Sequence, residues 1–212
     1  DLIINIGHDI IEKPPFIMQH DDTPVIHINY SSAQIDNVYF PNLEVIGDIA
    51  TTIESLSTLT SPQSHWDFSC YQKIQDAQAD YYQDACSIKP FPILPQCLVH
   101  EVRAALPEDG ILTLDTGMYK IWFARNYLTY HENTLLLDNA LATMGAGLPS
   151  AMAAKMVHPK RKVVAICGDG GFMMNVHEIE TAVRYQIDLT IIILCDNAYG
   201  MIKWKQASMH FN

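Results

Sequence analysis

Two apolar runs in the second half of the chain constrain its fold most. They span residues 163–167 and 189–195, and neither alternates apolar with polar side chains. Parallel strands that are covered by helices on both faces have this continuous apolar character. The intervening residues 176–185 have helical periodicity and supply the crossover that parallel neighbours require. The sequence therefore predicts an α/β fold, a doubly wound parallel sheet with helices on both faces.

The crossover helix has a recognisable beginning in the sequence. Asn175 is a candidate N-cap, and Glu178 follows three residues later as in a capping box. We expect the buried stripe of this helix to consist of Val176, Ile179, Ala182 and Val183.

An acidic residue follows each apolar run, Asp169 in GDGG and Asp196 in DNAYG. A right-handed crossover brings the carboxyl ends of both strands to the same edge of the sheet. Ligands bind at this edge in open α/β sheets. We therefore expect the two carboxylates to lie side by side at a ligand site.

Two neighbouring carboxylates repel each other unless a cation lies between them. Mg²⁺ commonly takes one or two carboxylates together with phosphate oxygens and water. The glycines of the motif permit close backbone approach, and the following helix offers free N–H groups to a phosphate; they are Gly168, Gly170 and Gly171. GDGG alone also fits a simple tight turn, but the second acidic strand end favours a Mg²⁺–diphosphate site. A dinucleotide site is not favoured, because no GxGxxG follows a strand.

Composition narrows the classes of partner. The net charge of −11 argues against nucleic acid or an anionic membrane as the main partner. No apolar run approaches the roughly 20 residues of a membrane span, and no charged leader with a cleavage site opens the sequence. The 5 cysteines are an odd number without CxxC spacing, which predicts reduced thiols in the cytoplasm. Cys167 and Cys195 are expected to be small buried apolar residues.

The chain alternates strands and helices in two parts. In the first, strands are expected at 2–6 and 25–28, and LEVIGDI (43–49) is expected to be a short strand that enters a helix. A loop is expected at Pro14 and Pro15, and a short helical piece at 33–36. A polar stretch with a helix at roughly 66–86 leads to KPFPILP, whose prolines suit an extended connector. The expected division is 1–56 for part of one α/β domain, 57–94 for a linker and 95–212 for the domain with the acidic strand ends. Because the chain starts without Met and stops near a helix start, we expect a piece of a longer protein.

Residues 168–200 resemble the binding motif of thiamine diphosphate (ThDP), which opens with GDG and closes with an Asn pair. Cys195 and Asp196 take the place of that pair. The resemblance implies that Asp169, Asp196 and the backbone carbonyl of Ala198 bind Mg²⁺. It also places the residues that follow in the cofactor site, namely Tyr199, Gly200 and Met201.

Two further segments resemble acetolactate synthases. LATMGAGLPSAMAA (141–154) is similar to their GTMGxGLPAAxGA segment, which implies that Thr143 and Met144 contact the cofactor and that Met144 is the apolar wedge that keeps it bent. DTGMYKIWFARNY (115–127) resembles D-V-G-x-H-x-x-W, with Gly117, Met118 and Tyr119 in its diphosphate loop. Tyr119 stands where the family has His. By itself Met144 also fits ordinary core packing.

The remaining segments extend the resemblance over nearly the whole chain. GMIKWKQ (200–206) matches the stretch after the metal loop and implies that Trp204 lies near the substrate entrance, although such an aromatic is as often just packing. INIGHDIIEKPP, VIHINYSSAQID and YFPNLEVIGDI resemble the central domain of the catabolic, FAD-independent branch. The biosynthetic R-F-D-D-R-V-T signature is absent, so we do not expect FAD as a cofactor. In this family the Glu that activates the cofactor lies on a separate pyrimidine-binding domain, usually of a neighbouring subunit. The resemblance thus implies a homodimer or homotetramer with a shared active site, and a segment that is inactive alone.

The leading hypothesis is a ThDP- and Mg²⁺-dependent carboligase that decarboxylates pyruvate and transfers the hydroxyethyl unit to a second 2-oxo acid. One alternative shares the cofactor but is a simple 2-oxo acid decarboxylase, of the benzoylformate or indolepyruvate type. The other alternative is a non-catalytic module that retains the fold for assembly or regulation. Product analysis with pyruvate distinguishes the first two, and cofactor binding tests the third.

Overall fold

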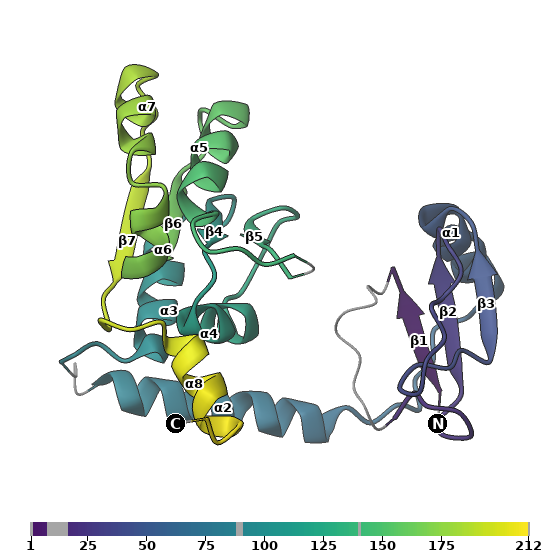
Figure 1. Ribbon diagram of the computed structural model, residues 1–212. Helices are drawn as coiled ribbons and strands as arrows, with labels where there is room; N and C mark the ends of the chain where they lie inside the picture. Colours follow the sequence, from purple (N-terminus) through teal and green to yellow (C-terminus); the bar gives the residue numbers. More distant parts are fainter. Residues whose placement is uncertain (1, 8–16, 88–90, 140, 212) are drawn as a thin grey trace. The chain divides into compact units, whose positions relative to one another are not determined.

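The computed structural model describes residues 2–7, 17–87, 91–139 and 141–211 (Figure 1). The chain divides into two compact units, Asp1–Phe68 and Ser69–Asn212. The finer assignment of 1–56, 57–94 and 95–212 to domains of a longer enzyme stays a prediction.

The first unit contains a parallel sheet in the order β1-β2-β3. Its strands are β1 (Ile3–Ile6), β2 (Val25–Asn29) and β3 (Leu43–Ile46), which confirms the strands expected from the sequence. Helix α1 (Ile49–Leu59) follows, and the Asp48 side chain caps it by accepting a hydrogen bond from the Thr51 N–H at 2.8 Å. The loop expected at Pro14 and Pro15 lies outside the described residues.

The prediction of a short helix at 33–36 is wrong. Asp36 instead forms an isolated antiparallel bridge with Tyr39. The Asp36 Oδ1 atom accepts hydrogen bonds from the N–H groups of Val38 and Tyr39, both at 2.9 Å. This side-chain competition for backbone donors favours a turn over a helix.

The second unit contains a four-stranded parallel sheet in the order β5-β4-β6-β7. Its strands are β4 (Ile111–Leu114), β5 (Leu135–Leu137), β6 (Val163–Gly168) and β7 (Thr190–Leu194). The predicted pairing of the two apolar runs is confirmed, since β6 and β7 are neighbours with Gly168 opposite Leu194. The sequence analysis missed β5, because a run of 3 residues carries almost no periodicity.

Helices cover both faces of this sheet, as predicted. On one face, α3 (Pro95–Ala105) and α4 (Met118–Asn126) pack on Leu112 and Leu114, with Phe123 fully buried. On the other face, α5 (Gly147–Val157) packs on Ile111 and Ala165. The alternation of β4 side chains between two apolar layers produces its continuously buried pattern.

The crossover between β6 and β7 differs from the expectation. Helix α6 (Asp169–Met174) begins directly after β6, and Asn175 is its C-cap rather than an N-cap. A second helix, α7 (Glu178–Arg184), completes the connection. The expected stripe is not buried, since Ile179 is 38% exposed and Val183 is 71% exposed.

The prediction that the cysteines are reduced thiols is wrong for one pair. Helix α2 (Ser69–Ser87) is linked to α3 by a disulfide between Cys86 and Cys97, whose Cα atoms are 5.3 Å apart. Spacing along the chain does not show this pair, because the two helices bring the thiols together. Cys167 is buried as expected, but Cys195 is exposed.

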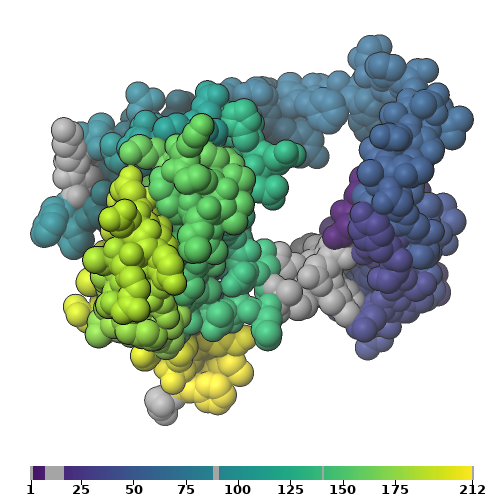
Figure 2. All heavy atoms as spheres, turned by 90° about the horizontal axis from the view of Figure 1, so that it is seen from above, coloured from purple at the N-terminus to yellow at the C-terminus, as the bar shows by residue number. Residues whose placement is uncertain are grey.

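The last helix, α8 (Gly200–Ser208), lies at the surface of the second unit, where it is yellow in Figure 2. Its side chains Ile202 and Trp204 are 54% and 56% exposed. Among the helices in the described ranges, none has the length and apolar character needed to span a bilayer.

Candidate functional site

The carboxyl ends of β6 and β7 bring the two acidic motifs together (Figure 1). The Asn197 N–H donates a hydrogen bond to Asp169 Oδ2 at 3.2 Å. The other oxygen, Oδ1, accepts from the Gly170 N–H at 2.9 Å. The GDGG and DNAYG motifs are therefore neighbours, as the crossover rule predicted, and the expectation that the two carboxylates themselves lie side by side stays a prediction.

Asp196 shapes the second motif as a tight turn. Its Oδ1 atom accepts from the Ala198 N–H at 3.1 Å. Asn197, between them, adopts a left-handed backbone with φ of 55°. Asn is among the residues that tolerate this conformation best. The Asn197 backbone is thus turned toward Asp169, a contact that the sequence analysis missed.

The glycines of GDGG are required by close approach of other groups. A Cβ atom on Gly171 would lie 2.4 Å from Asp115 Oδ2, and one on Gly170 would lie 2.7 Å from Cε1 of Tyr199. Either Cβ atom would force its neighbour to shift. The exposed Tyr199 ring has room to move, whereas Asp115 is buried, so glycine is required most strongly at position 171.

Tyr119 lies beneath the GDGG turn. Its hydroxyl oxygen accepts a hydrogen bond from the Gly168 N–H at 2.9 Å, and the residue is 7% exposed. Burial is the main cause that raises the pKa of the Tyr119 phenol above its ordinary value. The neutral hydroxyl keeps one proton that it can donate. Tyr119 therefore ties α4 to the end of β6 through its side chain.

A cavity of about 510 Å³ lies at this edge of the sheet. Most of the residues expected in the site line it: Gly117, Met118, Tyr119, Met144, Gly168, Asp169, Gly170, Gly171, Asp196, Ala198, Tyr199, Gly200 and Met201.

Thr143 and Trp204 are not among the residues that line the cavity. Thr143 is exposed, and its hydroxyl donates to the Met144 carbonyl at 3.2 Å. Trp204 is 56% exposed on α8. Their expected roles stay predictions.

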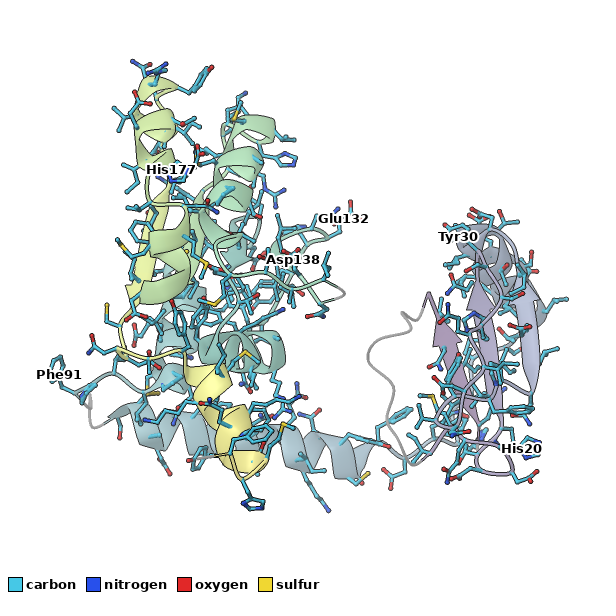
Figure 3. The ribbon with its side chains drawn as sticks, viewed as in Figure 1. His20, Tyr30, Phe91, Glu132, Asp138 and His177 are labelled. Carbon is cyan, nitrogen blue, oxygen red and sulfur yellow. A yellow bond between two sulfur atoms is a disulfide. The ribbon has the colours of Figure 1, made fainter. Side chains whose placement is uncertain are left out.

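One wall of the cavity was not expected from the sequence. It is formed by Pro92, Ile93, Pro95 and Leu98, around the start of α3. The preceding Phe91 points away from the protein and is 99% exposed (Figure 3). A disulfide between Cys97, within this segment, and Cys86 joins it to α2. The proline-rich connector predicted at 89–95 therefore contributes apolar surface to the cavity.

Asp115 is a further residue that the sequence analysis missed. It directly follows β4, so the strand-end rule that identified Asp169 and Asp196 would have found it as well. Asp115 is 1% exposed, and its Oδ1 atom accepts from the N–H groups of Thr116 at 2.7 Å and Gly145 at 2.8 Å. Its Oδ2 atom has no hydrogen-bond partner in the described part of the chain. Burial raises the pKa of this carboxyl above its ordinary value.

The donor set suits Mg²⁺ with a phosphate ligand. No group of three or more His, Cys, Asp or Glu side chains that could hold a metal occurs among the described residues. Asp169 and Asp196 offer two carboxylates at neighbouring strand ends, and the turn adds backbone carbonyls. Mg²⁺ keeps several water or phosphate oxygens in its shell, so two carboxylates are sufficient for it.

Comparison with known proteins agrees with this arrangement. Residues 115–212 match the thiamine pyrophosphate enzyme, C-terminal TPP binding domain, where thiamine pyrophosphate is another name for ThDP. The catabolic acetolactate synthase of Raoultella terrigena is 33% identical over 208 residues, which cover 95% of this chain and 37% of that protein. The acetolactate synthase of Bacillus subtilis (strain 168) is 34% identical over 211 residues, which cover 97% of this chain and 37% of that protein.

A third relative is the large subunit of acetolactate synthase isozyme 1 from Escherichia coli (strain K12). It is 29% identical over 192 residues, which cover 86% of this chain and 32% of the subunit. The chain thus spans about a third of the length of these relatives. The resemblance noted in the sequence is confirmed: residues 115–212 match the ThDP-binding domain, and the chain is related over most of its length to acetolactate synthases.

Proposed function

We propose that the protein containing this chain is a ThDP- and Mg²⁺-dependent carboligase of the acetolactate synthase type. Its substrate is pyruvate, and the hydroxyethyl unit left by decarboxylation passes to a second 2-oxo acid. The observation that carries the proposal is the cavity in which Asp169, Asp196 and Met144 all lie at one sheet edge. The acetolactate synthases that match most of the chain support the choice of reaction.

Each part of the cavity has a distinct task in this proposal. Asp169, Asp196 and the Ala198 carbonyl would hold Mg²⁺, and the start of α6 would receive the diphosphate. Bound ThDP would supply a nucleophilic carbon and accept the electron pair released by decarboxylation. Met144 lies across from the diphosphate turn, with its Cε atom 3.5 Å from the position of a Cβ on Gly170. An apolar side chain there would support the cofactor and exclude water.

The remaining assignments are also proposals. Gly117 and Met118 contact the diphosphate, Thr143 and Tyr199 border the cofactor, and Trp204 lies near the substrate entrance. Residues 1–56 belong to the central domain and 95–212 to the diphosphate-binding domain. A glutamate outside this chain activates the cofactor, which makes the enzyme a homodimer or homotetramer with shared active sites. FAD is not required, and the enzyme works in the cytoplasm.

The test uses the full-length protein. Calorimetric titration with ThDP and Mg²⁺ is expected to show binding that is lost when EDTA removes the metal. Incubation of the protein with ThDP, Mg²⁺ and pyruvate, without EDTA, should give acetolactate. Acetaldehyde as the sole product would identify a decarboxylase instead, and absence of ThDP binding at millimolar concentration would leave a non-catalytic module.

A further inference from the structure

Gly145, the residue that follows Met144, forms hydrogen bonds to two side chains, one through its N–H and one through its carbonyl group. The Gly145 N–H donates to Asp115 Oδ1 at 2.8 Å, and the Gly145 carbonyl accepts from Asn175 Nδ2 at 2.7 Å. Gly145 is buried and has a φ of 90°, which L side chains rarely adopt. Two side chains from distant parts of the chain therefore fix an unusual backbone conformation next to the residue proposed to support the cofactor.

We propose that Asp115 and Asn175 are positioning residues, which act through Gly145 to set where the Met144 side chain lies in the cavity. Neither residue lines the cavity itself, so neither is placed to touch the cofactor. This inference rests on the proposed function, because it assigns a purpose to the position of Met144.

Asp115 is suited to this role by its surroundings. A Cβ on Gly147 would lie 2.8 Å from the Asp115 Cβ, and one on Gly171 would lie 2.4 Å from its Oδ2 atom. The carboxyl thus lies where the end of β4, the 145–147 turn and the GDGG turn meet. Shortening this side chain would leave the buried Gly145 N–H without an acceptor, which costs free energy.

Asn175 connects the same turn to the diphosphate end of the site. It is the C-cap of α6, the helix that starts at Asp169. A Cβ on Gly145 would lie 2.9 Å from Asn175 Nδ2 and 3.1 Å from the Cβ of Met174. The six residues of α6 therefore lie between its start at Asp169, a proposed Mg²⁺ ligand, and the Asn175 side chain that bonds Gly145.

The test compares variants in the full-length protein. D115A and N175A each remove one hydrogen bond to Gly145. N175D keeps the size of the side chain, but an ionised carboxylate cannot donate. D115N is the conservative variant, because its amide oxygen can still accept from the Gly145 N–H. T134V is the matched control, since Thr134 is also 1% exposed and bonds the His131 carbonyl at 2.7 Å, away from the cavity lining.

Two measurements are made on each variant. The first is NMR of methionine methyl groups labelled with ¹³C, in which the resonance missing from M144L identifies Met144 among all the methionines of the protein, 9 of which lie in this chain. D115A, N175A and N175D should shift or broaden this resonance without cofactor, whereas D115N and T134V should leave it in place. The second is kinetics with pyruvate, where the first three variants should lower kcat by about 10- to 100-fold, the scale of a 1 Å misplacement. KM should change much less.

The outcomes separate this inference from the proposed function. If wild-type protein fails to bind ThDP, the proposed function is wrong. If wild-type protein is active but N175A leaves both the Met144 resonance and kcat unchanged, the positioning role is wrong. A fall in kcat that T134V reproduces would also contradict it. Should D115A not fold, N175A and N175D still decide the question.

Discussion

The backbone N–H of Asn197 lies 3.2 Å from Oδ2 of Asp169 and donates a hydrogen bond to it, although 28 positions separate the residues in the sequence. This bond links the ends of β6 and β7 and holds the two acidic motifs next to each other. The Asp169 carboxylate is held from both sides, because its Oδ1 accepts from the Gly170 N–H. The geometry of the site therefore depends on Asp169 before any metal is bound.

Replacing Asp169 by Ala should weaken Mg²⁺-dependent ThDP binding more than replacing Asp196. D169A removes a proposed ligand and two hydrogen bonds to backbone N–H groups, whereas D196A removes a proposed ligand and one. We expect a loss of affinity of at least about tenfold for each, about 1.4 kcal/mol or more. Calorimetric titration of the full-length protein measures it. D188A is the control, because Asp188 is exposed and does not line the cavity; an equal loss in D188A would indicate a general charge effect.

Tyr119→Phe should destabilise the GDGG turn. The variant removes the acceptor of the half-buried Gly168 N–H, which is expected to cost about 1 kcal/mol. ThDP affinity should also fall, because the turn forms the proposed diphosphate site. Urea unfolding and cofactor titration measure the two effects. Y185F is the control, since Tyr185 is 66% exposed. Unchanged stability and affinity in Y119F would show that the hydroxyl contributes nothing.

Removing the disulfide should lower the free energy of unfolding. The link between Cys86 and Cys97 closes a loop with a sequence separation of 11, for which loss of chain entropy predicts about 2–3 kcal/mol. The double variant C86S/C97S should therefore unfold at lower urea concentration than the oxidised wild type. A dithiol reductant should bring the wild type to the level of the variant. C70S, which replaces an exposed free thiol, should have no effect. Free thiols at both positions in the untreated protein would contradict the pairing.

Asp115 should give stability a characteristic pH dependence. Burial raises the pKa of its carboxyl in the folded protein above the value in the unfolded chain. The folded state therefore holds this proton more tightly, and the resulting stabilisation is complete below the unfolded pKa and is lost as pH rises through the folded pKa. D115N removes this contribution, so its stability relative to the wild type should increase as pH rises from about 4. Urea unfolding of both proteins at a series of pH values measures the difference, and a constant difference would contradict the raised pKa.

The strands at the site could be predicted because their signals are local. Residues 163–167 and 189–195 are continuous apolar runs, and their pairing followed from the handedness of crossovers. The crossover itself was predicted less well. Asn175 is of a residue type that is favoured at N-caps, but its side-chain amide donates a hydrogen bond to the Gly145 carbonyl, and α6 begins at Asp169. Propensity for a cap does not reveal which backbone group a side chain will meet.

The sequence by itself determined the class of fold, the edge of the sheet that holds the site and the acidic residues at that edge. These depend on periodicity along the chain and on general rules of parallel sheets. Only the tertiary structure decided that Asp115 and Asn175 both bond Gly145, that Cys86 pairs with Cys97 and that the 92–98 segment borders the cavity. Asp115 and Asn175 each lie 30 positions from Gly145, and such contacts depend on how whole helices and strands pack rather than on the residues around each one.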